Sequence, residues 1–226
     1  MPLTLLYSVL LLLFTSSFYH GTWRGVDYTS TSFINSRYLT SRIPAKDKRF
    51  STFLLALNLM KASGAKTLVE TGTARLGCKN CRGDGCSTII FGHFAKDHQM
   101  EFYSVDISPE AIASSRSAVA PINPDAKLVV DDSIAFLKNF NQPIDFLYLD
   151  SYDFEVNDPL PSQLHHLYEI QAAYPCLHEG STVMIDDCDL PHGGKGKLAI
   201  AWLLERGWKI LLSQYQVVLA PGNNCF

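Results

Sequence analysis

Two kinds of apolar segment alternate along the chain from residue 45 onward. Short runs rich in aliphatic and aromatic residues indicate buried strands, at residues 66–71, 101–108, 127–132, 144–150 and 181–187. Segments with apolar residues at helical spacing lie before and between them, at residues 46–64, 87–98, 108–120, 133–140, 161–177 and 195–207. This alternation predicts a parallel sheet with helices on both faces. The last two apolar runs, 208–213 and 216–221, are too close together for a crossover and predict an antiparallel hairpin. The expected fold is α/β and doubly wound, a seven-stranded, mostly parallel sheet with a C-terminal antiparallel hairpin.

Several helix ends carry local signals. Gly64 is typical of a C-cap, Pro109 suits the first position of a helix, and Ser87 and Thr88 are N-cap residue types. These signals support the helix boundaries that the periodicity predicts.

The composition favours small-molecule chemistry. Apolar residues make up 47% of the 226 residues and charged residues 18%, as expected for one compact domain. Nineteen basic and 22 acidic residues give a net charge of -3, and there is no long basic run. We therefore expect a small-molecule partner and no nucleic-acid partner.

The N-terminal 20 residues contain no Lys, Arg, Asp or Glu. Three interpretations stay open: a membrane anchor that associates through residues 3–18, a secretion signal, or a buried helix. Mostly basic residues follow and favour a cytoplasmic domain if the segment is an anchor, so secretion is the less favoured location. The expected division is this hydrophobic segment (1–20), an extension (21–45) and one domain (46–226).

Each of the first five predicted strands ends on a carboxylate. These carboxylates are Glu70, Asp106, Asp131 with Asp132, Asp150, and Asp186 with Asp187. Doubly wound sheets bind ligands beyond the carboxyl ends of their strands. A single Asp there is commonly a helix N-cap or turn former, and for Asp132 that alternative is equally favoured. Five in succession predict a binding site, in which Gly72 permits a tight turn and Asp106 can accept both hydroxyls of a ribose.

The order of these strand ends resembles that of class I S-adenosylmethionine (SAM)-dependent methyltransferases, which have a Rossmann-like fold. The resemblance covers residues 50 to 220 and rests on Glu-x-Gly after the first strand, Asp106, Asp-Ser after the third strand, Leu-Asp after the fourth, and the final hairpin. "ETGT" followed by "GDGCST" is similar to small O-methyltransferases with a lengthened glycine loop, although Ala74 stands where a second glycine is common. A dinucleotide-binding G-x-G-x-x-G does not fit, because Gly77 is the next glycine after Gly72.

The resemblance implies a SAM-binding methyltransferase domain and a role for each matching position. Glu70, Gly72, Thr73 and Ser87 would surround the methionine part of SAM. Asp106 would bind the ribose, Ile107 would lie against the adenine, and Asp132 and Ser133 would address the adenine amino edge. A sulfonium cation is favoured near such an acidic rim.

The resemblance extends to catechol-type O-methyltransferases, which bind magnesium with an Asp after the fourth strand and an Asp-Asn pair after the fifth. This chain has Asp-Asp in place of Asp-Asn, which is still a set of oxygen ligands. It implies a Mg²⁺ site at Asp150, Asp186 and Asp187 that would activate the acceptor hydroxyl. The alternative is that Asp150 contacts the cofactor amine and the pair forms a turn.

The general base of those enzymes, a lysine, is replaced here by Asp153. His192 and Lys195 in "PHGGKGK" are the candidate bases, and Asp153 is a candidate further metal ligand. The alternative, slightly favoured for "PHGGKGK", is a flexible lid with solvated charges.

Cys78, Cys81 and Cys86 cluster within the glycine loop. They are compatible with three free thiols, which we favour, with a loop disulfide, or with a zinc site completed by Cys188 or His93. The functional hypothesis is a SAM-dependent methyltransferase that O-methylates a small molecule with divalent-metal assistance. The rival is a non-catalytic protein that binds SAM or a nucleoside on the same fold.

Overall fold

The computed structural model describes residues 32–222 and contains one seven-stranded sheet of order β3-β2-β1-β4-β5-β7-β6. Strands β1 to β5 are parallel, and β7 pairs antiparallel with both β5 and β6. The strand bounds are β1 Thr67–Thr71, β2 Glu101–Asp106, β3 Lys127–Val130, β4 Ile144–Leu149, β5 Leu177–Ile185, β6 Trp208–Ser213 and β7 Val217–Pro221. The predicted fold class is confirmed.

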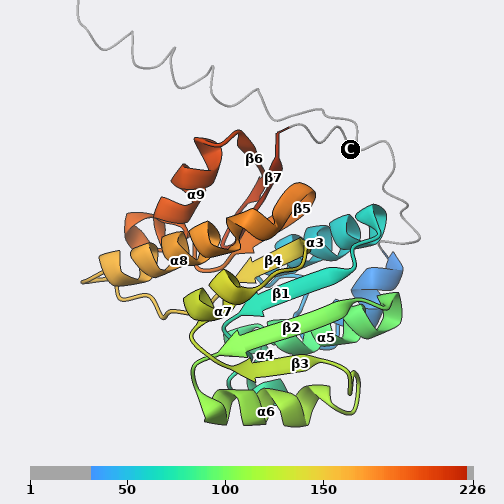
Figure 1. Cartoon of the computed structure of the whole chain (residues 1–226). Coiled ribbons are helices and arrows are strands. Elements are labelled where there is room, and N and C mark those ends of the chain that lie inside the picture. Colours follow the sequence, from blue (N-terminus) through green and yellow to red (C-terminus); the bar gives the residue numbers. More distant parts are fainter. Residues whose placement is uncertain (1–31, 223–226) are drawn as a thin grey trace, which may run out of the picture.

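Helices cover both faces of this sheet (Figure 1). Their bounds are η2 Asn35–Leu39, α3 Phe50–Ser63, η3 Gly77–Asn80, α4 Cys81–Asp84, α5 Ser87–His98, α6 Pro109–Val119, α7 Ser133–Asn139, α8 Leu160–Ala173, η4 Tyr174–Cys176, η5 Pro191–Gly193 and α9 Lys197–Leu204. One apolar core lies between the sheet and η2, α3 and α5, and a second lies between the sheet and α7, α8 and α9. Alternate side chains of the strands, such as Leu68 and Val69 of β1, enter opposite cores.

Most of the predicted helix ends are found. Gly64 ends α3 in a left-handed conformation with a φ of 66°, and Ser108 caps α6 by accepting a hydrogen bond from the Ala111 amide. Helix α5 differs, because its N-cap is Cys86, with a φ of 52° and no side-chain cap, while Ser87 and Thr88 lie buried in the first turn. These two hydroxyls are therefore free to hold the neighbouring loop.

The final hairpin is confirmed, but its second strand lies inside the sheet rather than at its edge. Because β7 is antiparallel to β5, the β6–β7 turn lies at the carboxyl end of β5, where Val217 pairs with Ile185. The Cys188 amide donates to the Tyr215 carbonyl at 2.7 Å. The turn thus adds Tyr215 and Gln216 to the edge at which ligands bind in such sheets.

The hydrophobic segment predicted at residues 1–20, with its anchor, signal and buried-helix interpretations, lies outside the described residues. Within residues 32–222, no helix has the length and apolar character needed to cross a bilayer. Ile34, Tyr38, Leu39 and Ile43 of the predicted extension are buried in the α3–α5 core. The domain boundary at residue 46 stays a prediction.

Candidate active site

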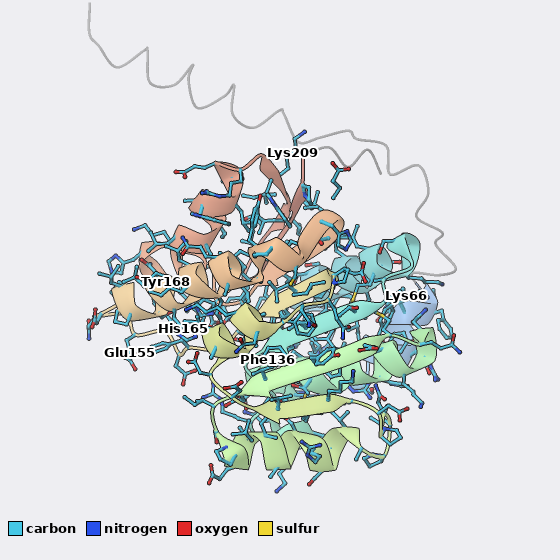
Figure 2. All side chains as sticks on the ribbon, viewed as in Figure 1. Lys66, Phe136, Glu155, His165, Tyr168 and Lys209 are labelled. Atoms are coloured by element: carbon cyan, nitrogen blue, oxygen red, sulfur yellow. A yellow bond between two sulfur atoms is a disulfide. The ribbon has the colours of Figure 1, made fainter. Side chains whose placement is uncertain are left out.

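A cavity of about 460 Å³ lies beyond the carboxyl ends of β1, β2, β4 and β5. In Figure 2, Lys66 just before β1 and Glu155 in the loop after β4 mark the two opposite ends of the parallel strands, and the cavity lies at the Glu155 end. Predicted site residues that line it are Gly72, Thr73, Ser87, Asp106, Ile107, Asp150, Asp186, Asp187 and Lys195. These nine predicted residues therefore share one cavity, and their roles stay predictions.

The loop after β1 is held close to β4. Gly72 has a φ of 78°, and a Cβ there would lie 2.3 Å from the Asp150 carbonyl oxygen, so only glycine fits. The Ala74 amide donates to the Thr88 hydroxyl at 2.7 Å, and the Ala74 carbonyl accepts from Ser115 at 2.8 Å. Ala74 is thus anchored to α5 and α6, and a second glycine is not needed for this path.

Asp106 ties two loops together at the end of β2. Its Oδ2 accepts from the Thr73 amide at 3.0 Å, and its Oδ1 accepts from the Ser108 amide at 2.8 Å. The adjacent Ile107 side chain is 73% exposed toward the cavity edge. A carboxylate beside an exposed apolar side chain suits a ribose and an adenine ring.

Three predicted cofactor residues lie outside the cavity lining. Glu70 is fully buried and accepts from the Ser104 hydroxyl at 2.5 Å, and burial raises its pKa to about 7. Asp132 is the N-cap of α7 and accepts a hydrogen bond from the Ala135 amide at 2.8 Å. This is the helix N-cap role that the sequence offered as the alternative to cofactor binding. Ser133 is 3.0 Å from the Nε2 atom of His165. Their direct contact with the cofactor stays a prediction.

The acidic trio surrounds a lysine. Lys195 Nζ is 2.7 Å from Asp150 Oδ1 and 3.1 Å from Asp187 Oδ2, and the Lys195 side chain is only 2% exposed. Burial alone would lower the pKa of Lys195, but the carboxylates of Asp150, Asp187 and Asp186 outweigh it and raise that pKa. Lys195 is therefore a fixed ammonium and is unsuited to the role of general base.

Asp150, Asp186 and Asp187 form the acidic end of the cavity, and two tyrosines and a glutamine contact it. Tyr148 donates to Asp186 Oδ2 at 2.8 Å, and Gln216 Nε2 donates to the Tyr148 hydroxyl at 3.0 Å. Tyr215 donates to Asp187, and Thr52 of α3 donates to Gln216. Burial, then the neighbouring carboxylates of Asp150 and Asp187, raise the pKa of Asp186 well above its usual range.

The "PHGGKGK" segment is ordered around the acidic end. Gly194 has a φ of 58°, and a Cβ there would lie 1.8 Å from the Asp187 carbonyl oxygen. Gln163 of α8 donates to the carbonyls of Gly194 at 3.1 Å and His192 at 3.2 Å. The expectation of solvated charges is wrong for Lys195, because this packing buries it. His192 is exposed and lies outside the cavity lining, so a role as base is not supported there.

The residues present do not fit the predicted Mg²⁺. The Lys195 ammonium takes the position between Asp150 and Asp187 that a cation would occupy. No group of three or more His, Cys, Asp or Glu side chains in residues 32–222 is arranged to hold a metal. Asp153, a candidate further ligand, instead forms a two-point ion pair with Arg75 at 2.9 and 3.0 Å.

The cysteine cluster contains one disulfide, between Cys81 and Cys86, and an exposed free thiol at Cys78. The favoured expectation of three free thiols is wrong, because the turn of α4 brings the Cα atoms of Cys81 and Cys86 within 4.6 Å. Because Cys81 and Cys86 are bonded to each other, they are not available as ligands of the predicted zinc site. Arg49 fixes the same loop by donating to the carbonyls of Arg82 at 2.8 Å and Gly83 at 2.9 Å.

Sequence reasoning missed Arg49, Arg75 and Tyr215, which all line the cavity. Arg49 is a basic residue near the start of a predicted helix, where an exposed side chain is the ordinary expectation, yet it is 5% exposed. Tyr215 sits in the short hairpin connection, and no local pattern indicates that this turn reaches Asp187. No sequence pattern indicates that Arg75, in the loop after β1, lines the cavity.

The comparisons agree on one fold. The family model of a methyltransferase domain matches residues 82–188, and no curated protein sequence matches the chain. NSun6 from Pyrococcus horikoshii, in a structure with SFG, has a TM-score of 0.57 and 13% identity over 81% of this chain, which spans 56% of that chain. A proposed O-methyltransferase from Klebsiella pneumoniae has a TM-score of 0.55 and 13% identity, covering 86% of this chain and 90% of its own.

One partner expectation is corrected by these comparisons. A proposed rRNA methylase from Clostridium thermocellum has a TM-score of 0.54 and 12% identity, covering 78% of this chain and 97% of its own. RNA methylases therefore share this fold, and the expected exclusion of nucleic acid as a partner is contradicted. The NSun6 structure contains SFG, and a proposed methyltransferase from Streptococcus mutans, with a TM-score of 0.51 and 16% identity, is in complex with SAH. The family model and the solved structures together show that this chain has the Rossmann-like fold of methyltransferases and is similar to them over residues 82–188.

Proposed function

We propose that this chain transfers the methyl group of SAM to a hydroxyl oxygen of a small polar acceptor. The observation that supports this proposal most is that the cavity has two chemically different ends, which the strand order β2-β1-β4-β5 places apart. Asp106 and Ile107 follow β2 at one end, while Asp150, Asp186 and Asp187 follow β4 and β5 at the other. The first end suits the nucleoside of SAM, and the second suits a hydroxyl that must lose a proton.

The residues of the cavity fit SAM by their chemistry. Gly72 lets the backbone approach a ligand without a side chain in the way. Asp106 would accept from the ribose hydroxyls, and the carboxylates of the rim favour the cationic sulfonium. When bound, SAM supplies an electrophilic methyl group and a neutral thioether leaving group.

In the proposed reaction the acceptor oxygen attacks the methyl carbon as the bond from that carbon to sulfur breaks. The acceptor proton passes to a carboxylate of the acidic end, which we assign to Asp150 because it lies between the Gly72 loop and Lys195. Lys195 keeps its proton and balances the charge of that end. The solved O-methyltransferase-like neighbour supports this chemistry only through its fold.

Calorimetry with SAM and with its demethylated product tests cofactor binding in the full chain. Asp106→Ala is expected to weaken binding about 30-fold, or about 2 kcal/mol, because two charge-assisted hydrogen bonds to the ribose are lost. Asp125→Ala is the matched control, since Asp125 pairs with Lys96 on the exposed surface. Equal affinity in Asp106→Ala and the wild type would contradict the ribose assignment.

Turnover is tested with methyl-labelled SAM on small hydroxyl acceptors and, in parallel, on RNA transcripts. Label in a small hydroxyl compound supports the proposal, and label only in RNA replaces it with RNA methylation. Binding of SAM without transfer to either class favours the non-catalytic alternative.

A further inference from the structure

Lys195 occupies the position that the acidic trio would otherwise offer to a metal. Its Nζ contacts carboxylate oxygens from two different strand ends, Asp150 after β4 at 2.7 Å and Asp187 after β5 at 3.1 Å. The third carboxylate, Asp186, is turned toward Tyr148 and is 5% exposed. One ammonium thus joins the two strand ends that a shared cation would join.

The surrounding backbone is shaped to deliver this ammonium. The Lys195 amide donates to the Asp187 carbonyl at 3.1 Å, and Gly194 lies too close to that carbonyl for any side chain. Gln163 holds the Gly194 carbonyl from α8. Three contacts therefore hold the backbone of Gly194 and Lys195, and the Lys195 side chain is only 2% exposed.

Charge balance favours a cation between Asp150 and Asp187, whose side chains are only 22% and 21% exposed. Carboxylates that share a buried space repel one another unless a proton or a cation intervenes. An unpaired buried ammonium is equally unfavourable, so Lys195 and the two carboxylates stabilise each other. A divalent ion at the same place would meet the Lys195 ammonium at contact distance and be repelled.

We propose that Lys195 is the resident cation of the active site and replaces the divalent metal, so that Asp150 and Asp187 are positioned for a metal-independent methyl transfer. This inference deepens the proposed function and shares its site. Lys195 is a positioning residue here, because it acts through the carboxylates. Removal of its side chain should convert the trio into a metal site, since three carboxylates are ligands that Mn²⁺ prefers.

Binding of Mn²⁺ to the cofactor-free full chain, followed by electron paramagnetic resonance, tests the inference. The wild type is expected to bind Mn²⁺ only weakly, whereas Lys195→Ala should bind Mn²⁺ at least about ten-fold more tightly than the wild type. Lys197→Ala is the matched control, because Lys197 is an exposed lysine in the first turn of α9. Lys195→Ala/Asp187→Asn should lose the gained binding, which shows that the new site uses the trio.

Wild-type binding of Mn²⁺ that Asp150→Asn abolishes would overturn the inference, and so would folded Lys195→Ala that gains no binding. If Lys195→Ala does not fold, circular dichroism of the double variant decides: recovery of the fold on adding Asp187→Asn supports charge balance, and failure to recover it overturns that role. None of these measurements uses SAM or an acceptor. Failure of this inference is therefore distinguishable from failure of the proposed function, which the calorimetry and labelling test separately.

Discussion

Glu70 is a single residue whose ionisation makes the free energy of unfolding depend on pH. It is fully buried beside Ser104, and burial raises its pKa to about 7 from an ordinary value of 4.5. Between these two values the folded chain binds more protons at Glu70 than the unfolded chain does. The contribution of Glu70 to the free energy of unfolding is therefore lost as pH rises from about 4.5 to about 7.

Glu70→Gln should remove this pH dependence. We expect the wild type to be less stable than the variant by up to about 3 kcal/mol above pH 7, with the difference shrinking toward pH 5. Urea unfolding of both proteins at several pH values measures it. The comparison must be between variants, because His166, whose pKa burial lowers to about 4, contributes a slope of the opposite sign. A difference that does not change with pH would contradict the assignment.

At the scale of elements, the segment from η3 to the start of α5 depends on a covalent clamp. The disulfide closes a short loop with a sequence separation of 5, and Gly83, Asp84 and Ser87 of this segment line the cavity. Arg49 holds the loop from the other side through two backbone carbonyls. The clamp thus connects α3 and α5 to the predicted cofactor site.

Reduction of the disulfide should loosen the cofactor site as well as the fold. A loop of this length predicts a loss of about 2 kcal/mol in the free energy of unfolding. Thermal melts with and without a thiol reductant measure it, and calorimetry with SAM should show weaker binding after reduction. Cys78→Ser is the control, because Cys78 is exposed and free. Unchanged stability and affinity in the reduced chain would show that Arg49 alone fixes the loop.

Elements were more predictable from sequence than the site. Helix α5 and the strand ends follow from periodicity, because burial of one face is a local property of the pattern. The convergence of the carboxylates followed from the rule for parallel strands. The position of Lys195 did not, because it depends on the left-handed backbone at Gly194 and on a contact with Gln163, which lies far away in the chain.

For the whole molecule, stability depends on the two apolar layers that clamp the sheet. Phe91 of α5 is fully buried against Phe53, Phe146 and Tyr148, with ring centroids 5.4 to 5.6 Å apart. Phe91→Ala should lower the free energy of unfolding by about 3 to 5 kcal/mol, because a large cavity opens in the α3–α5 layer. Chemical denaturation measures this loss, and Phe33→Ala is the control, since Phe33 is 52% exposed. A loss below 1 kcal/mol would mean that the layer repacks.

The order in which the chain is synthesised bears on when the acidic end can form. Gln216 completes a chain of hydrogen bonds that runs from Thr52 through Tyr148 to Asp186, and Thr52 and Gln216 are 164 positions apart. Until the ribosome has released β7, the edge of β5 is unpaired and the Tyr148 hydroxyl lacks its donor. A nascent chain that stops before residue 214 would therefore contain Asp106 and Ile107, which we assign to the nucleoside of SAM, but its acidic end would be incomplete.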